Sequence, residues 1–168
     1  GLSGKAKAFG DLQKVIQENN VPEIHLREGD VIKYQDINIL TLGPNIADLK
    51  RGDINEAGIV LLLQKGGLRA LYAADIGFKK EQELLKKYDL SAQVLKVAHH
   101  GSKYSTSREF LNKVQPKLSF IGVGKNNYGH PTEATLGRLA NIGSQVFRTD
   151  LDRTVKAVFD DGSLKVYR

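Results

Sequence analysis

Residues that can bind metal or move protons gather at three points of the sequence. Asp75 directly follows one apolar stretch, the pair His99-His100 follows the next, and His130 lies in the loop after a third. Carboxylate and imidazole are protein ligands that suit Zn²⁺ or Mn²⁺. A carboxylate can also bridge two metal ions, which together activate water and hold a phosphate oxygen. The pattern predicts a metal-dependent hydrolytic site if the three points meet in space.

The residues after the histidine pair add a possible anion site. Gly101 allows close approach of the backbone, and Ser102 with the following N–H groups could bind a phosphate. Simpler interpretations remain open at each point. An Asp at the end of a strand is usually a turn residue or a helix cap. His130 could only anchor its loop, and the pair Asn126-Asn127 could be turn chemistry.

The pattern of apolar residues predicts elements that would bring these points together. A helix is expected over 5–18, a loop over 43–57, and helices over 78–88, 107–114 and 132–141. Strands are expected at 24–26, 31–34, 37–42, 59–63, 68–73, 94–98, 118–123, 146–149, 155–159 and 164–167. The run 59–63 is wholly apolar, which predicts a strand buried on both faces. Because helices alternate with the later strands, we expect one mixed α/β domain over 1–168, with polar residues at the carboxyl ends of its strands.

Composition narrows the class of protein. The chain has 168 residues, 40% apolar and 26% charged, which excludes a disordered or collagen-like chain. Its longest apolar run has only five residues, too short to span a bilayer. The absence of Cys excludes disulfides and thiolate metal ligands. A net charge of +6 suits a nucleic-acid partner, although solvated surface lysines explain it equally well.

Three motifs together resemble a known family. They are Ala73-Ala74-Asp75, the run VLKVAHHGS over 94–102, and the run GVGKNNYGHP over 122–131. This combination is similar to the metallo-β-lactamase-like domain at the C-terminus of ComEC-type competence proteins, which are membrane channels for DNA uptake. Arg148-Thr149-Asp150 matches a late strand of that family. The resemblance covers the chain from about residue 40 to residue 167.

The resemblance implies a fold, an activity and a location. The fold would be a four-layer αββα sandwich with a metal site at one rim, holding one or two Zn²⁺ or Mn²⁺ ions in the complete domain. The activity would be hydrolysis of DNA, such as degradation of the strand that is not taken up. The domain itself would be soluble and tethered to the bacterial cell membrane on its extracytoplasmic side.

The resemblance also implies roles for individual residues. Asp75 would be the metal-bridging carboxylate and His100 a later metal ligand. His99 would support the metal or touch the phosphate, and His130 and Asn127 would lie near the substrate, so that these three form the predicted catalytic group. The predicted substrate-binding residues are Ser102, Lys103 and Asn126.

The sequence departs from the family pattern at its front. The H-x-H-x-D-H motif, which supplies most of the first metal site, does not occur. The chain opens as the family does just after that motif, so we expect a piece of a longer protein that lacks the first strands of the sandwich. A segment that often carries a further ligand has no His here, and Asp53 or Asn55 would be a weak substitute. The family usually has Ser where this chain has Gly58. We therefore expect weak metal binding and little or no activity from this chain alone.

Other functions remain open. The chain could be a non-catalytic DNA-binding module, for which the basic residues beside the motifs are Lys96, Lys103, Arg108 and Lys125. It could also be a stand-alone phosphoesterase of the same fold acting on a small substrate. Contact with a membrane is expected only through other segments of a longer protein. Exposed sheet edges would also permit a homo-oligomer.

Overall fold

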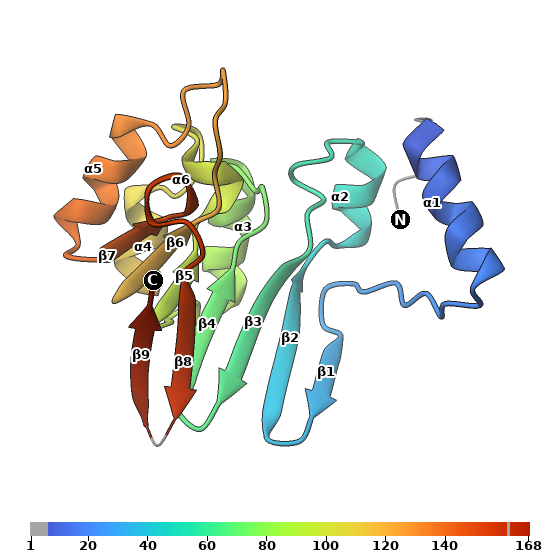
Figure 1. Cartoon of the computed structure of the whole chain (residues 1–168), viewed down its shortest axis with the longest axis horizontal. Helices are drawn as coiled ribbons and strands as arrows, with labels where there is room; N and C mark the ends of the chain where they lie inside the picture. Colours follow the sequence, from blue (N-terminus) through green and yellow to red (C-terminus); the bar gives the residue numbers. More distant parts are fainter. Residues whose placement is uncertain (1–6, 161) are drawn as a thin grey trace.

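Across residues 7–160 and 162–168, which the computed structural model describes, a mixed seven-stranded sheet forms the centre (Figure 1). Its strands are β1 (Val31–Tyr34), β2 (Ile37–Gly43), β3 (Val60–Lys65), β4 (Leu68–Tyr72), β5 (Val94–Lys96), β6 (Leu118–Ile121) and β7 (Gln145–Arg148). They lie side by side in sequence order. Pairs from β1 to β4 are antiparallel, whereas β4, β5, β6 and β7 run parallel. The expected α/β class is confirmed, and the arrangement is compatible with an α/β sandwich.

Helices accompany the sheet along the chain. In the described residues they are α1 (Lys7–Glu18), α2 (Ile46–Arg51), α3 (Phe78–Lys87), α4 (Arg108–Val114), α5 (Glu133–Asn141), α6 (Thr149–Asp152) and the short 3₁₀ helix η1 (Ala98–Gly101). The crossovers through α3, α4 and α5 step along the sheet in one direction. Because such crossovers are right-handed, they place these helices on one face. A separate hairpin, β8 (Lys156–Asp160) with β9 (Ser163–Tyr167), lies in front of the other face (Figure 1).

The two faces of the parallel strands differ in burial. Leu71 and Leu95 pair in register and are fully buried in the core with residues of α3, α4 and α5. The next register row, on the opposite face, contains Tyr72, Lys96 and Phe120, none of which is fully buried. The hairpin covers this face only in part, and a cavity of about 300 Å³ remains beneath it. The helical face therefore holds the core, and the hairpin face stays partly open.

Three expectations about the elements are wrong. Residues 24–26 form no strand and belong to an extended linker in which Ile24 is 82% exposed. The stretch 59–63 is not buried on both faces: in β3, Leu61 and Leu63 are only half-buried, because the hairpin face is incompletely covered. The expected loop 43–57 contains α2, whose start at Asn45 carries a capping box with Asp48.

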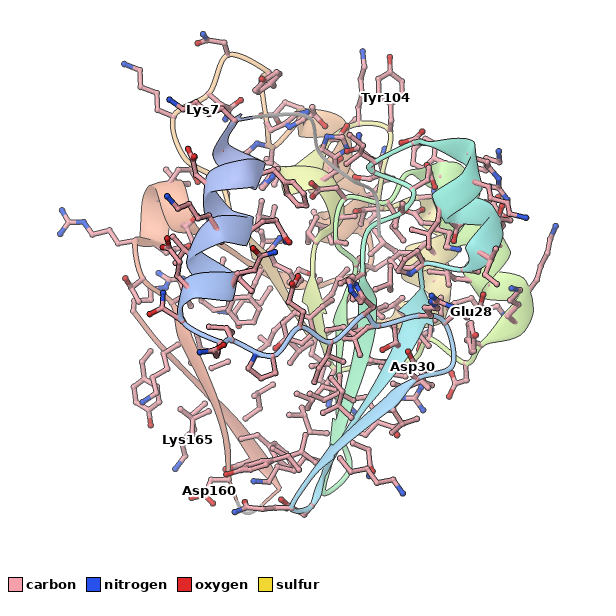
Figure 2. The ribbon with its side chains drawn as sticks, turned by 90° about the vertical axis from the view of Figure 1, so that its right-hand side faces the viewer. Lys7, Glu28, Asp30, Tyr104, Asp160 and Lys165 are labelled. Carbon is pink, nitrogen blue, oxygen red and sulfur yellow. The ribbon has the colours of Figure 1, made fainter. Side chains whose placement is uncertain are left out.

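The first helix lies apart from the rest of the molecule. It begins at Lys7 in the described residues, and the earlier part of the expected helix lies outside them. No residue of α1 is buried, and its apolar side chains Leu12 and Val15 are more than half exposed. Figure 2 shows it at one side of the sheet, joined by an extended linker. The elements from β2 to β7 therefore position the candidate site without help from α1.

Candidate functional site

The carboxyl ends of β4, β5 and β6 bring the three predicted points together. These strands are neighbours and run in the same direction. Asp75 follows β4, His99 and His100 follow β5, and His130 lies in the loop after β6. That loop rises above the upper rim of the sheet in Figure 1. The expectation that parallel strand ends collect these residues at one rim is confirmed.

The backbone at this rim has unusual conformations. Ala74, His99 and His100 have positive φ angles of 47°, 46° and 53°. Residues other than glycine rarely adopt this left-handed region, and such strain clusters at functional sites. The N–H of His99 donates to the carbonyl of Ala74 at 3.0 Å, which ties the ends of β4 and β5 together. The histidine pair is therefore held in a fixed, costly turn.

The ring of His100 is oriented by one nitrogen and offers the other to Asp75. Its Nδ1 lies 2.6 Å from the carbonyl oxygen of Gly122, which can only accept a hydrogen bond. Nδ1 therefore carries a proton, and in the neutral ring Nε2 has a free lone pair. Nε2 lies 4.0 Å from Oδ1 of Asp75, and both side chains are about half exposed. A histidine that donates to a backbone carbonyl through one nitrogen is oriented as metal-binding histidines usually are.

The other two imidazoles lie against each other. The ring centroids of His99 and His130 are 5.6 Å apart, with the rings nearly perpendicular. Burial lowers the pKa of His130, and the neighbouring His99 and His100 lower it further. His130 is held by Asn126, whose Oδ1 accepts from its N–H and whose Nδ2 donates to its carbonyl. The side-chain amide of Asn126 thus makes its hydrogen bonds within the loop, whereas Asn127 is exposed.

A lysine lies beneath the acidic residue of the site. Lys96 extends from β5 on the hairpin face, and its Nζ donates to the carbonyl of Val97 at 3.1 Å. Burial lowers the pKa of Lys96, and the nearby Asp75 carboxylate partly opposes this change. The Lys96 side chain therefore brings a partly desolvated positive charge close to Asp75.

Two predicted substrate-binding residues, Ser102 and Lys103, follow the histidine pair and differ in exposure. Ser102 is buried, and its Oγ accepts from the N–H of Tyr104 at 3.3 Å. Lys103 is exposed, and its Nζ lies 5.0 Å from the centre of the Tyr104 ring. The hydroxyl of Ser102 thus stabilises the turn, and the ammonium group of Lys103 is exposed at the surface.

Two of the described residues offer atoms that could bind a divalent metal ion. Asp75 and His100 bring a carboxylate oxygen and an available imidazole nitrogen to one point. Among residues 7–160 and 162–168, no group of three or more His, Asp or Glu side chains is placed so that it could hold a metal ion. Oδ1 of Asp53 accepts hydrogen bonds from the N–H groups of Asn55 and Glu56 and so closes its own turn.

The glycine that departs from the family pattern is explained by its surroundings. A Cβ placed on Gly58 would lie 2.8 Å from the Cβ of Ala74 and 3.1 Å from the carbonyl oxygen of Asn55. Both distances are shorter than ordinary contacts. A serine at this position would therefore displace the backbone that precedes Asp75.

The sequence indicated no site role for three residues that organise this rim. Oγ1 of Thr149, at the start of α6, lies 2.7 Å from both the N and the O of Val123 and so fixes the chain after β6. Glu81 in α3 and Arg138 in α5 hold the backbone of residues 103–107. Each of them binds main-chain atoms of a segment distant in sequence, and side-chain type and spacing give no signal for such contacts.

Comparison with curated proteins shows similarity to competence and recombination proteins. The chain is 35% identical over 162 residues to ComE operon protein 3 of Bacillus subtilis (strain 168), a match that covers 92% of this chain. It is 37% identical over 125 residues, 73% of the chain, to competence protein ComA of Neisseria gonorrhoeae. It is 31% identical over 137 residues to recombination protein 2 of Haemophilus influenzae. No protein-family model matches the chain.

The similarity concerns only part of each relative. The matched regions make up 21%, 18% and 17% of these relatives, so the chain spans about a fifth of their length. Homology to competence proteins of the ComEC type, predicted from the motifs, is confirmed. Among the described residues, no helix is both long and apolar enough to cross a membrane.

Proposed function

We propose that this chain is the metal-binding part of a hydrolase domain that acts on DNA in a competence protein. The observation that carries the proposal is the contact between Asp75 and His100 at the carboxyl rim of the parallel strands. The ring of His100 is held by Gly122 so that its free nitrogen points to the carboxylate. Homology to competence proteins supports a role in DNA uptake. The proposal includes a metallo-β-lactamase-like fold for the complete domain.

The proposed chemistry assigns each residue a limited task. Asp75 and His100 would hold the divalent ion, Zn²⁺ or Mn²⁺. When bound, the ion supplies Lewis-acid polarisation of a phosphate and activates water. His99 and His130 lie close enough to share one substrate oxygen, and their ring nitrogens would hold or donate a proton there. Further ligands would come from another segment of the complete protein, one that carries the H-x-H-x-D-H motif.

The partner we propose is DNA, single-stranded or duplex. The chain carries a net charge of +6, and the exposed Lys103 lies on the loop that follows the histidine pair. Contacts of this kind bind phosphates without reading the base sequence. The complete protein would be bound to the cell membrane, with this part on the outer side.

A metal titration of the purified chain tests the proposal. Mn²⁺ binding would be followed by the electron paramagnetic resonance of the free ion, for wild type, Asp75→Asn and the control Asp36→Asn. Asp36 is exposed in the turn between β1 and β2. We expect weak binding by wild type and the control, and none by Asp75→Asn. Binding that is equal in all three, or absent from all three, would contradict the proposed site.

The charge of the chain favours a second candidate function, a DNA-binding module without catalysis. Both functions predict DNA binding that weakens steeply with salt. They differ in whether metal-dependent cleavage occurs when the chain is part of its complete protein. Loss of that cleavage in Asp75→Asn, with DNA affinity unchanged, would favour the hydrolase. A complete protein that binds DNA and never cleaves it would favour the module.

A further inference from the structure

A buried carboxylate faces the backbone that follows the histidine pair. Glu81 of α3 is fully buried, and its two oxygens accept hydrogen bonds from the N–H groups of Thr106 and Ser107. Thr106 has a positive φ of 58°, a strained conformation for a β-branched residue, and this contact helps to hold it. Burial raises the pKa of Glu81, and the bonds from Ser107 and Thr106 oppose that rise. Burying a carboxylate is costly, and here the cost is offset by hydrogen bonds from this one segment and by the charge of the nearby Arg138.

An arginine holds the same segment through its carbonyl groups. In α5, Nε of Arg138 donates to the carbonyl of Thr106 at 2.8 Å. Nη2 donates to the carbonyl of Ser105 at 2.9 Å and approaches that of Lys103 at 3.3 Å. The planar fork of a guanidinium suits several acceptors in one plane, which a lysine cannot match. Two side chains of opposite charge, from two helices, therefore hold the N–H and the C=O groups of one loop.

This hold reaches the histidine pair through a chain of short contacts. Nη2 of Arg138 donates to Oγ1 of Thr135, which in turn donates to the carbonyl of Ser102 at 2.8 Å. The N–H of Ser102 donates to the carbonyl of His99 at 2.9 Å. Arg138 is thus connected to the strained turn at His99 through the side chain of Thr135 and the backbone of Ser102.

We propose that Glu81 and Arg138 are positioning residues for the candidate site. They fix the segment 102–107, here called the clamp loop, so that His99 and His100 keep their left-handed backbone and present their rings at the rim. The inference rests on the proposed metal-binding function and deepens it. Core stability alone would be served by an apolar side chain in place of Glu81, since burying a carboxylate is costly.

The test uses conservative variants of the purified chain. Glu81→Gln keeps the shape and loses the charge, and Arg138→Lys keeps the charge and loses the fork. Glu109→Gln is the control, because Glu109 is exposed in α4 and contacts Gln82 rather than the clamp loop. Two readouts are needed: the imidazole signals of His99, His100 and His130 in proton–carbon NMR spectra, and the affinity for Mn²⁺.

We expect both clamp variants to fold, to shift the signals of His99 and His100, and to bind Mn²⁺ about tenfold more weakly. The control should match wild type in both readouts. Folded clamp variants with wild-type signals would overturn the inference. If Glu81→Gln does not fold, Arg138→Lys decides the question alone, and failure of both to fold would show a role in folding only. If wild type binds no Mn²⁺, the proposed function fails, while the imidazole signals still test the positioning.

Discussion

Nε2 of His100 lies 4.0 Å from Oδ1 of Asp75, while Nδ1 of the same ring is fixed 2.6 Å from the carbonyl of Gly122. One imidazole therefore connects the ends of three neighbouring strands, β4, β5 and β6. The ring cannot turn toward another partner without losing its bond to Gly122. This contact makes His100 the sharpest target for a mutational test.

Replacing His100 with alanine should abolish Mn²⁺ binding. The chain should stay folded, because the His100 side chain is half exposed and its loss removes no core packing. His25→Ala is the matched control, since His25 is exposed in the linker before β1. Metal affinity and the thermal midpoint should be measured for both. Unchanged metal binding with a lowered thermal midpoint would show that His100 is structural.

Gly101 should tolerate no side chain. Its φ is +83°, and an added Cβ would lie 2.6 Å from the Cβ of Pro131. Gly129 has a similar φ of +71° but open space around it, so Gly129→Ala isolates the backbone cost of about 1–2 kcal/mol. Gly101→Ala should lower the free energy of unfolding by about 1–3 kcal/mol more, as over-packing does. Urea denaturation of both variants measures the difference, and equal losses would argue against the tight contact.

The sequence predicted the parallel half of the fold well, because its strands and helices alternate with clear periodicity. The start of α4 at the cap Ser107 is found as expected. The front half was harder. Ile24 and Leu26 alternate with polar residues as in a strand, yet they lie in an unpaired linker of the described structure. Alternation reports only that side chains face opposite ways, and a strand also needs a neighbour.

The site was predicted as far as side-chain chemistry reveals it. Asp75 and His100 do meet, since their place at strand ends follows from topology. The engagement of Ser102 within its own turn could not be foreseen, nor could the contacts of Glu81 with the clamp loop. These depend on how main-chain atoms of distant segments pack together, which residue type does not encode.

Exposed lysines near the rim should set the salt dependence of DNA binding. Lys103 and Lys125 are exposed on the loops after β5 and β6. If each contacts one phosphate, replacing either with glutamine should reduce the slope of log affinity against log salt by about 1. Lys113→Gln is the control, because Lys113 lies in the last turn of α4, away from the rim. Fluorescence anisotropy with a labelled oligonucleotide measures the slope, and an unchanged slope in both variants would place DNA elsewhere.

The phenol of Tyr88 should make stability depend on alkaline pH. Burial raises the pKa of Tyr88 from 10.0 to about 12, and its hydrogen bond of 2.6 Å to Glu28 contributes to the rise. The folded state therefore binds this proton more tightly than the unfolded state does. The resulting stability is fully present below pH 10 and is lost as the pH rises toward 12. Urea denaturation across this range should show a smaller loss for Tyr88→Phe than for wild type, and an identical loss would contradict the prediction.

The buried ion pair between Lys80 and Asp48 should be the most sensitive charged contact in the described structure. Both side chains are almost completely buried, and Asp48 also caps α2 by accepting from the N–H of Asn45 at 2.8 Å. Lys80→Met would leave the buried carboxylate with only Arg51, 3.7 Å from its other oxygen, as a cationic partner, at a cost of up to about 3–5 kcal/mol. The double variant Lys80→Met with Asp48→Asn removes both charges and keeps an oxygen for the cap. It should therefore be more stable than Lys80→Met alone in urea denaturation. If the double variant is the less stable of the two, Asp48 stabilises α2 mainly through its charge, and the stranded carboxylate is not the source of the loss.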